Sequence, residues 1–404
     1  MKIHTARSGE SIFTIARKYA IPPTKIIEHN ELSEPDRLIP GQKLLILTPT
    51  RTHTTRGSDT VESIAKRYNV SKDSLFAANP GLLGEEKCAT GKVLSIKYDT
   101  PRYGLGIGNG FFYEGCTIER LTTLLPYMSY LTVSLGRWER GALKLKFKAE
   151  NIVSLAHSMN KTPLLRVFAP ECAEDFLISS EKFISAIPKA AKELGFGGIS
   201  LAAFSLVEKN ASVDFLINLK KELLEYDMLL ALELDLNKSS EVYHDLSEIA
   251  DIVTLSYEKC FMKNIPSFRE SELRTFSEYA ERSAPERGFI DLPAFAYSEN
   301  EEISKRDAEL IARRAGEEIE YDPDSMVCYF SYNKYSSGKR ERKKIAYASL
   351  ENVNARLGLI GDLGYMGASF DIMRIPLEYV LCFYSNFGRT EILTTAKKEG
   401  CLRE

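Results

Sequence analysis

From about residue 100 onward, short apolar runs alternate with segments of amphipathic helical periodicity such as 180–194 and 212–226. Each run is apolar at consecutive positions, so both of its faces can be buried, as in a parallel sheet. The predicted strands are 103–107, 130–134, 164–168, 198–204, 228–234, 252–257, 289–296 and 366–372. Eight runs in this alternation are typical of a closed (β/α)8 TIM barrel. An open doubly wound sheet is the rival fold, but no glycine-rich phosphate turn follows the first run.

The interval between the seventh and eighth runs is longer than the others. It contains a helical pattern over 301–318 and two alternating runs, 326–333 and 343–348, around the turn residues Ser336-Ser337-Gly338. We therefore predict a small α+β insertion over 299–349, placed over the C-terminal mouth where barrel active sites lie. The barrel is predicted to span 101–390, followed by a C-terminal tail over 391–404.

A repeat occupies the front of the chain. The segment 4–30 returns as 53–79 without a gap, and each copy ends in a glycine turn and a short apolar run. Ser11 or Thr60 stands immediately before an apolar helical pattern and is a suitable helix N-cap. Each copy is thus predicted to form a β-α-α-β module. The two predicted modules span 1–48 and 51–98.

These modules resemble LysM modules in the segment Ile15-Ala16 to Tyr19, in Asn30 at the end of the second helix, and in the turn Pro40-Gly41-Gln42. The resemblance implies binding of glycans that contain N-acetylglucosamine, such as peptidoglycan or chitin. The implied contacts are Gly9, Glu10, Ser11, Ile12, Asn30, Glu31 and Leu32, then Ser58, Asp59, Thr60, Val61, Asn79, Pro80 and Gly81. The alternative is that residues such as Gly9, Ser11 and Asn30 only form turns and caps.

Composition narrows the class of protein. With 404 residues, 44% of them hydrophobic, and a net charge of −3, the chain is predicted to be soluble and globular. Its 7 scattered cysteines lack zinc-ligand spacing, so we predict no metal and no cofactor. Basic residues are dispersed over the front end without a nucleic-acid motif, which predicts no nucleic-acid partner. No apolar stretch long enough for an export signal or a membrane span is present, so synthesis in the cytoplasm is expected.

Three further segments carry a second resemblance. The segments 251–258, 289–297 and 358–370 are similar to glycoside hydrolase family 18, and the order of modules and barrel resembles spore-associated cortex-lytic N-acetylglucosaminidases. The family uses the acetamide of its substrate as nucleophile and needs a protonated glutamate on the fourth strand. Aspartates at alternate positions before it face the same barrel lumen.

Laid on this chain through Gly195-Phe196-Gly197-Gly198-Ile199, the family motif falls on residues without a carboxylate. The implied positions are Gly197, Ser200, Ala202 and Phe204. The tryptophan that forms the floor of the family's pocket falls on Asp371, whereas the single tryptophan of this chain, Trp138, lies elsewhere. The resemblance therefore implies the fold of a hydrolase without its proton donor.

Other polar residues lie at predicted strand ends. Tyr257 matches a family tyrosine that binds the acetamide, although an ordinary rim aromatic is an equal interpretation. Glu258, Asp291 and Asp371 accompany it, and Glu208 is a weak candidate for a displaced acid. Glu233 and Asp235 share a strand face as a relocated carboxylate pair or as a solvated strand end.

Two functions follow as hypotheses. The first is a non-catalytic protein of the cell wall or spore envelope that binds peptidoglycan, with a wall or spore-coat protein as a possible partner. The alternative is an active retaining glycosidase that acts on cortex peptidoglycan with relocated acids. Deposition on the forespore from the mother cell is the expected location in a host that forms spores.

Overall fold

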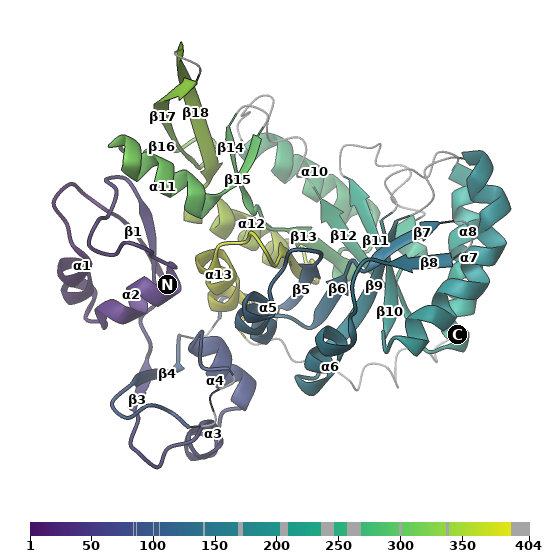
Figure 1. Ribbon diagram of the computed structural model, residues 1–404, viewed down its shortest axis with the longest axis horizontal. Coiled ribbons are helices and arrows are strands. Elements are labelled where there is room, and N and C mark those ends of the chain that lie inside the picture. The colour runs from purple at the N-terminus through teal and green to yellow at the C-terminus, as the bar shows by residue number, and fades with distance from the viewer. Residues whose placement is uncertain are drawn as a thin grey trace.

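The computed structural model places two small modules beside a large barrel (Figure 1). It describes residues 1–83, 85, 87–99, 101–104, 106–139, 142–168, 173–202, 209–235, 246–256, 268–298, 301–336 and 339–388. The insertion projects from one side of the barrel and lies next to the first module. Among these residues, no helix is long and apolar enough to cross a membrane.

Each front-end module has the predicted β-α-α-β order. The first contains β1 (Lys2–Thr5), α1 (Ile12–Tyr19), α2 (Pro23–His29) and β2 (Lys43–Ile46). The second contains β3 (Arg51–Thr54), α3 (Val61–Tyr68), α4 (Lys72–Ala78) and β4 (Val93–Lys97). Ser11 and Thr60 cap α1 and α3, because their hydroxyls accept from the amides of Thr14 at 3.2 Å and Ser63 at 3.1 Å.

The barrel is closed and has eight parallel strands, which confirms the predicted fold. Its strands, in chain order, are β5 (Ile107–Phe112), β6 (Tyr130–Val133), β9 (Thr162–Phe168), β10 (Gly198–Ala202), β11 (Leu229–Asp235), β12 (Ile252–Ser256), β13 (Gly288–Asp291) and β19 (Gly367–Asp371). The surrounding helices are α5 (Ile118–Leu124), α6 (Glu150–Ser158), α7 (Ala173–Glu193), α8 (Lys209–Glu225), α10 (Phe268–Arg282), α12 (Leu350–Asp362) and α13 (Leu377–Phe387). Apolar side chains on the outer face of the strands pack against these helices in one core.

The insertion between β13 and β19 is confirmed as an α+β unit. Its sheet has the order β15-β14-β18-β17-β16. The elements are β14 (Phe295–Ser298), β15 (Glu301–Ser304), α11 (Lys305–Ala315), β16 (Glu320–Asp322), β17 (Val327–Ser336) and β18 (Lys339–Ala348). Ile39 of the first module joins the apolar core under this sheet, so the module packs directly on the insertion.

Several predicted element boundaries were wrong, and for three of them the structure shows a physical reason. The first strand spans Ile107–Phe112 rather than 103–107, and two of its residues are glycines at points of close packing. A Cβ on Gly108 would lie 2.2 Å from the Tyr127 carbonyl oxygen. The seventh run splits into β13 and β14 around Pro293, which cannot donate to a ladder. The helix predicted from 301 begins only at Lys305, where the Ser304 hydroxyl accepts from the Asp307 amide at 3.0 Å.

Both modules are packed against the barrel. Leu45 and Leu47 of the first module and Ala77 of the second belong to the same apolar core as the barrel helices. The Tyr127 hydroxyl donates to the Ala77 carbonyl at 2.7 Å, and Lys43 Nζ lies 2.7 Å from Glu351 Oε1 on α12. The modules are therefore built into the protein rather than tethered to it.

Candidate functional site

One layer of the barrel lumen, above its apolar base, is lined by polar side chains. The lowest lumen layer is apolar and contains Leu164, Ala231, Ile252 and Phe289. Because side chains alternate along a strand, the residues two positions further on also face the lumen. These residues are Arg166, Glu233, Thr254 and Asp291, joined from the other strands by Asn109, Thr132, Ser200 and Ser369. A polar interior of this kind is suited to binding a polar ligand.

Glu233 is the centre of the best-connected group in this layer. Arg166 on β9 donates through Nε to Glu233 Oε1 at 2.8 Å and through Nη2 to Oε2 at 2.5 Å. Ser200 on β10 also donates to Oε1, at 2.9 Å. Burial would lower the pKa of Arg166, but the adjacent Glu233 carboxylate outweighs burial and raises it. The Glu233 oxygens thus act as acceptors in a two-point ion pair.

The positions implied for the family motif lie where the alternation of β10 puts them. Gly197 immediately precedes β10, and Ser200 and Ala202 are both buried on its lumen face. Ala202 is paired with Glu233 in the parallel register, so a carboxylate of β11 lies next to the acid-free positions of β10. Phe204, Glu208, Tyr257 and Glu258 lie outside the described residues, as does the side chain of Asp235 at the end of β11.

Asp371 ends β19 at the mouth of the lumen. The Tyr113 hydroxyl donates to it, lying 2.9 Å from Oδ1 and 2.8 Å from Oδ2, and the amide of Met373 donates to Oδ1 at 3.0 Å. Burial raises the pKa of Asp371 above its usual value and outweighs Tyr113 and the nearby Arg374, which act in the opposite direction. Asp291 accepts a hydrogen bond from Ser369, so the two aspartates lie on neighbouring strands of one wall.

The predicted glycan contacts of the modules include residues that hold the loops in place and residues that differ in their exposure to solvent. Glu10 and Asp59 hold their loops to the first strands through His4 Nε2 at 3.0 Å and His53 Nε2 at 2.8 Å. The hydrogen bond from His53 and then that from the Arg56 amide lower the pKa of Asp59. The exposed positions are Gly9, Glu31, Ser58 and Gly81, whereas Ile12, Leu32 and Val61 are buried and Ser11, Thr60 and Pro80 are half-buried.

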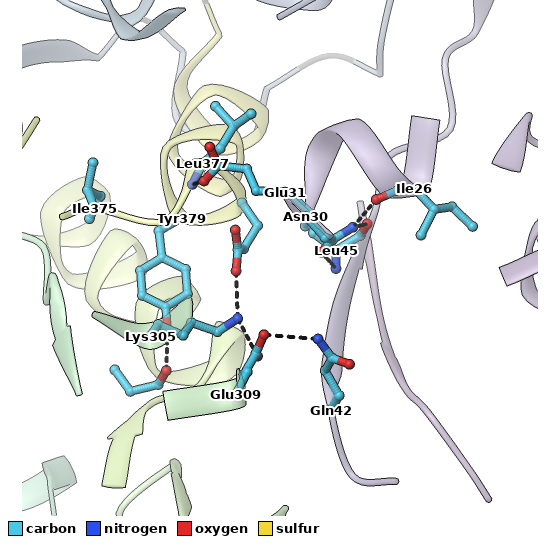
Figure 2. Close-up of polar contacts among 12 residues, drawn as sticks. Ile26, Asn30, Glu31, Gln42, Leu45, Lys305, Glu309, Ile375, Leu377 and Tyr379 are labelled. Atoms are coloured by element: carbon cyan, nitrogen blue, oxygen red, sulfur yellow. Dashed lines mark hydrogen bonds and ion pairs between the residues drawn. The ribbon is translucent and has the colours of Figure 1, made fainter. Parts of the chain in front are cut away.

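Asn30 and Asn79 link a helix end to a strand in both modules. The Asn30 amide donates to the carbonyls of Ile26 and Leu45 at 2.9 and 3.0 Å, and its oxygen accepts from the Leu45 amide at 2.7 Å (Figure 2). Asn79 makes the equivalent contacts with Leu75 and Ser95. Both side chains therefore stabilise the loop that was predicted to contact sugar, without themselves being exposed.

Glu31 connects the first module to the barrel, a role that the sequence did not predict. Arg120 Nη1 on α5 donates to Glu31 Oε1 at 2.5 Å, and the Leu377 amide at the start of α13 donates to Oε2 at 2.9 Å. Figure 2 shows Glu31 beside Leu377. Within the described ranges, no group of three or more His, Cys, Asp or Glu side chains is placed to hold a metal ion.

Comparison with known proteins supports this architecture. Residues 4–47 and 53–97 match the LysM domain family. Over 82 residues the chain is 39% identical to the putative sporulation-specific glycosylase YdhD of Bacillus subtilis, a match that covers 20% of this chain and 19% of that protein. The chain therefore spans about a fifth of the length of that relative.

The protein thus consists of two LysM domains and a barrel with the fold of glycoside hydrolase family 18. Its whole length is similar in fold to the spore cortex-lytic enzyme SleL of Bacillus megaterium, with a TM-score of 0.74 and 21% identity over 97% of this chain and 99% of that one. A chitinase from Chromobacterium violaceum matches 70% of this chain and 100% of its own, with a TM-score of 0.61 and 14% identity. At these identities the likeness shows the fold alone.

Proposed function

We propose that this protein binds peptidoglycan, or a related polymer of N-acetylglucosamine, through its LysM domains and that its barrel holds glycan without cleaving it. The proposal is supported by the two LysM matches and by the fold shared with a cortex-lytic enzyme and a chitinase. A location in the cell wall or spore cortex is consistent with the sporulation-specific and cortex-lytic relatives.

One observation carries the non-catalytic part of the proposal. Ser200 and Ala202 occupy lumen positions of β10 where the resemblance calls for aspartates, and neither can hold a proton for transfer at neutral pH. The neighbouring carboxylate, Glu233, accepts hydrogen bonds from Arg166 and Ser200. A general acid must instead present its proton to the leaving oxygen within hydrogen-bond reach.

The LysM assignment predicts a loss of retention when carboxylates are added to both glycan loops. Gly9 and Gly81 have φ angles of 79° and 82° and open space where a Cβ would lie, which an aspartate tolerates better than most residues. The full-length variant Gly9→Asp/Gly81→Asp is expected to bind insoluble peptidoglycan about tenfold more weakly. This corresponds to a loss of about 1.4 kcal/mol in binding free energy. A sedimentation assay measures the bound fraction.

Gly364→Asp is the matched control for this experiment. Gly364 also has a positive φ, 74°, and open space around it, but it lies between α12 and β19 at the opposite end of the barrel from the mouth. Full-length point variants are required because Leu45 and Leu47 pack in the barrel core and a truncation would expose that core. Equal retention of the double variant and the control would refute glycan binding by these loops.

A second candidate function, an active retaining glycosidase, is favoured by Asp371. This carboxyl is located at the lumen mouth, and its raised pKa suits a group that must keep a proton nearer neutral pH. Asp371 could replace the missing carboxylates of β10 only if a sugar bound close to β19. This is because β19 lies between β13 and β5 and is not a neighbour of β10.

The two functions differ in a reducing-end assay on purified cortex peptidoglycan. We expect the protein to release no reducing ends above the level of the variants Asp371→Asn and Glu208→Gln, because Ser200 and Ala202 supply no proton. Release by the unmodified protein that disappears in either variant would replace the binding proposal with a glycosidase that uses that residue.

A further inference from the structure

A pocket lies where the first LysM domain, the barrel and the insertion meet, and we call it the junction pocket. Its volume is about 820 Å³, within the range of roughly 300–1,000 Å³ that ligand sites occupy. One wall is the loop Asn30–Ser33, which belongs to the predicted glycan-binding loop of the LysM domain. The other walls are Glu302–Asp307 of the insertion and Met373–Pro376 after β19.

The walls of the junction pocket are fixed by buried polar contacts. Lys305 Nζ lies 2.7 Å from Glu309 Oε1 and 2.7 Å from Glu378 Oε1, which joins α11 to α13. Gln42 Nε2 of the LysM domain donates to Glu309 Oε2 at 3.0 Å. Figure 2 shows Glu309 between Lys305 and Gln42. Because three parts of the chain meet in one hydrogen-bonded group, the pocket is formed before any ligand arrives.

The chemistry of the lining does not suit a sugar ring. Among the described residues that line the pocket, none is aromatic, so there is no flat apolar face of the kind that aromatic side chains provide. Charges of both signs are present, together with small apolar patches at Leu32, Ile303 and Met373. Mixed charges and small apolar patches favour a ligand that has carboxylates, an ammonium group and methyl groups.

Two of the lining charges are available to such a ligand. Arg306 and Glu302 are both exposed, and neither forms an ion pair with another residue that the structure describes. Other charges of the lining are already engaged: Glu31 by Arg120, and Arg374 by Asp371, with Nη1 to Oδ2 at 3.6 Å. An arginine binds carboxylates well because of its planar fork of donors, and a glutamate beside it can accept from an ammonium group.

We propose that the junction pocket binds a short peptide with both carboxylate and ammonium groups, which in a wall polymer is the stem peptide of peptidoglycan. The inference rests on the proposed binding of peptidoglycan. It adds a binding site for the stem peptide, which is the part of the polymer that a LysM loop does not bind. Because Asn30–Ser33 belongs to both the glycan loop and the pocket, the sugar and the stem peptide bind next to each other.

The test compares two ligands, intact insoluble peptidoglycan and glycan strands from which an amidase has removed the stem peptides. The pocket variants are Glu302→Lys and Arg306→Glu, each in the full-length protein. The controls are Glu301→Lys and Arg314→Glu, which make the same charge reversals at exposed positions of β15 and α11 outside the pocket. Unchanged circular dichroism and thermal midpoints establish that all four variants are folded.

Each pocket variant is expected to bind intact peptidoglycan roughly tenfold more weakly than the matching control, because a like charge then meets the peptide terminus. On peptide-free strands all four variants are expected to bind like the unmodified protein. A free stem tetrapeptide is expected to compete with intact peptidoglycan only down to the level seen with peptide-free strands.

The possible failures are distinguishable. Equal binding of intact and peptide-free material by the unmodified protein, with no difference between pocket and control variants, overturns the pocket inference and leaves glycan binding by the LysM domains in place. Weaker binding of the pocket variants to peptide-free strands as well assigns the pocket to sugar and also overturns it. Absence of binding to either material removes the proposed function itself.

Discussion

Replacing Lys305 with methionine is expected to lower the free energy of unfolding by about 3–5 kcal/mol, the usual cost of removing one partner from a buried ion pair. Lys305 is buried, and burial would lower its pKa, but the carboxylates of Glu309 and Glu378 raise it well above its usual value. The variant leaves both carboxylates in the protein interior without a cation. Urea unfolding followed by circular dichroism measures the loss.

The pH dependence of this loss follows from Glu378. Burial already raises the pKa of Glu378 in spite of Lys305, and removal of the cation raises it further. A carboxyl whose pKa is higher in the folded state takes up a proton on folding, so lowering the pH favours the folded variant. The deficit relative to the unmodified protein should therefore be largest near pH 8 and shrink towards pH 5.

Lys221→Met is a suitable control, since Lys221 is exposed on α8 and forms no ion pair with another described residue. This change should alter stability by less than about 0.5 kcal/mol. If Lys305→Met costs no more than the control, or if its deficit grows as the pH falls, the junction is hydrated and Lys305 does not hold it together.

The pattern of apolar and polar residues along the chain predicted those elements that are packed in a regular way against their neighbours. The LysM helices follow from a repeat in register, and most of the barrel strands were predicted from short apolar runs alternating with helical segments, a pattern that strands covered by helices tend to show. The strand β5 was displaced in the prediction because Gly108 and Gly110 are typical of a turn. They are required instead by close contacts with Tyr127 and Met128, residues that lie far enough along the chain to be invisible to a local pattern.

The polar contacts between domains could not be predicted in this way. Glu31 was assigned to a glycan loop because its position matched one, whereas its carboxylate contacts Arg120 and the Leu377 amide. Those partners are far away in the sequence and belong to different elements. Arg166 did leave a signal: a cation in the centre of the apolar run Leu164-Leu165-Arg166-Val167-Phe168 needs a buried acidic partner. Glu233 was predicted to belong to a relocated carboxylate pair or to a solvated strand end, and its ion pair with Arg166 was not predicted.

Breaking the ion pair between Arg166 and Glu233 is expected to have a large effect on the stability of the protein. Arg166→Leu should lower the free energy of unfolding by about 3–5 kcal/mol, because the Glu233 carboxylate, 4% exposed, would retain only its hydrogen bond from Ser200. The same change removes the positive charge at the centre of the lumen. Urea unfolding followed by the fluorescence of Trp138, which packs on Phe183 beside the barrel, measures the effect.

A double-mutant cycle separates the lost attraction from the cost of the charge left behind. Arg166→Leu/Glu233→Leu removes both charges, and replacing a buried ion pair with apolar side chains is often nearly neutral. The double variant should therefore be more stable than Arg166→Leu, although the Ser200 hydroxyl loses its acceptor and costs about 1 kcal/mol. If the double variant is the less stable of the two, Glu233 without Arg166 finds another partner or water. The lumen would then contain a carboxylate available to take part in proton transfer, which is the condition that the glycosidase alternative requires.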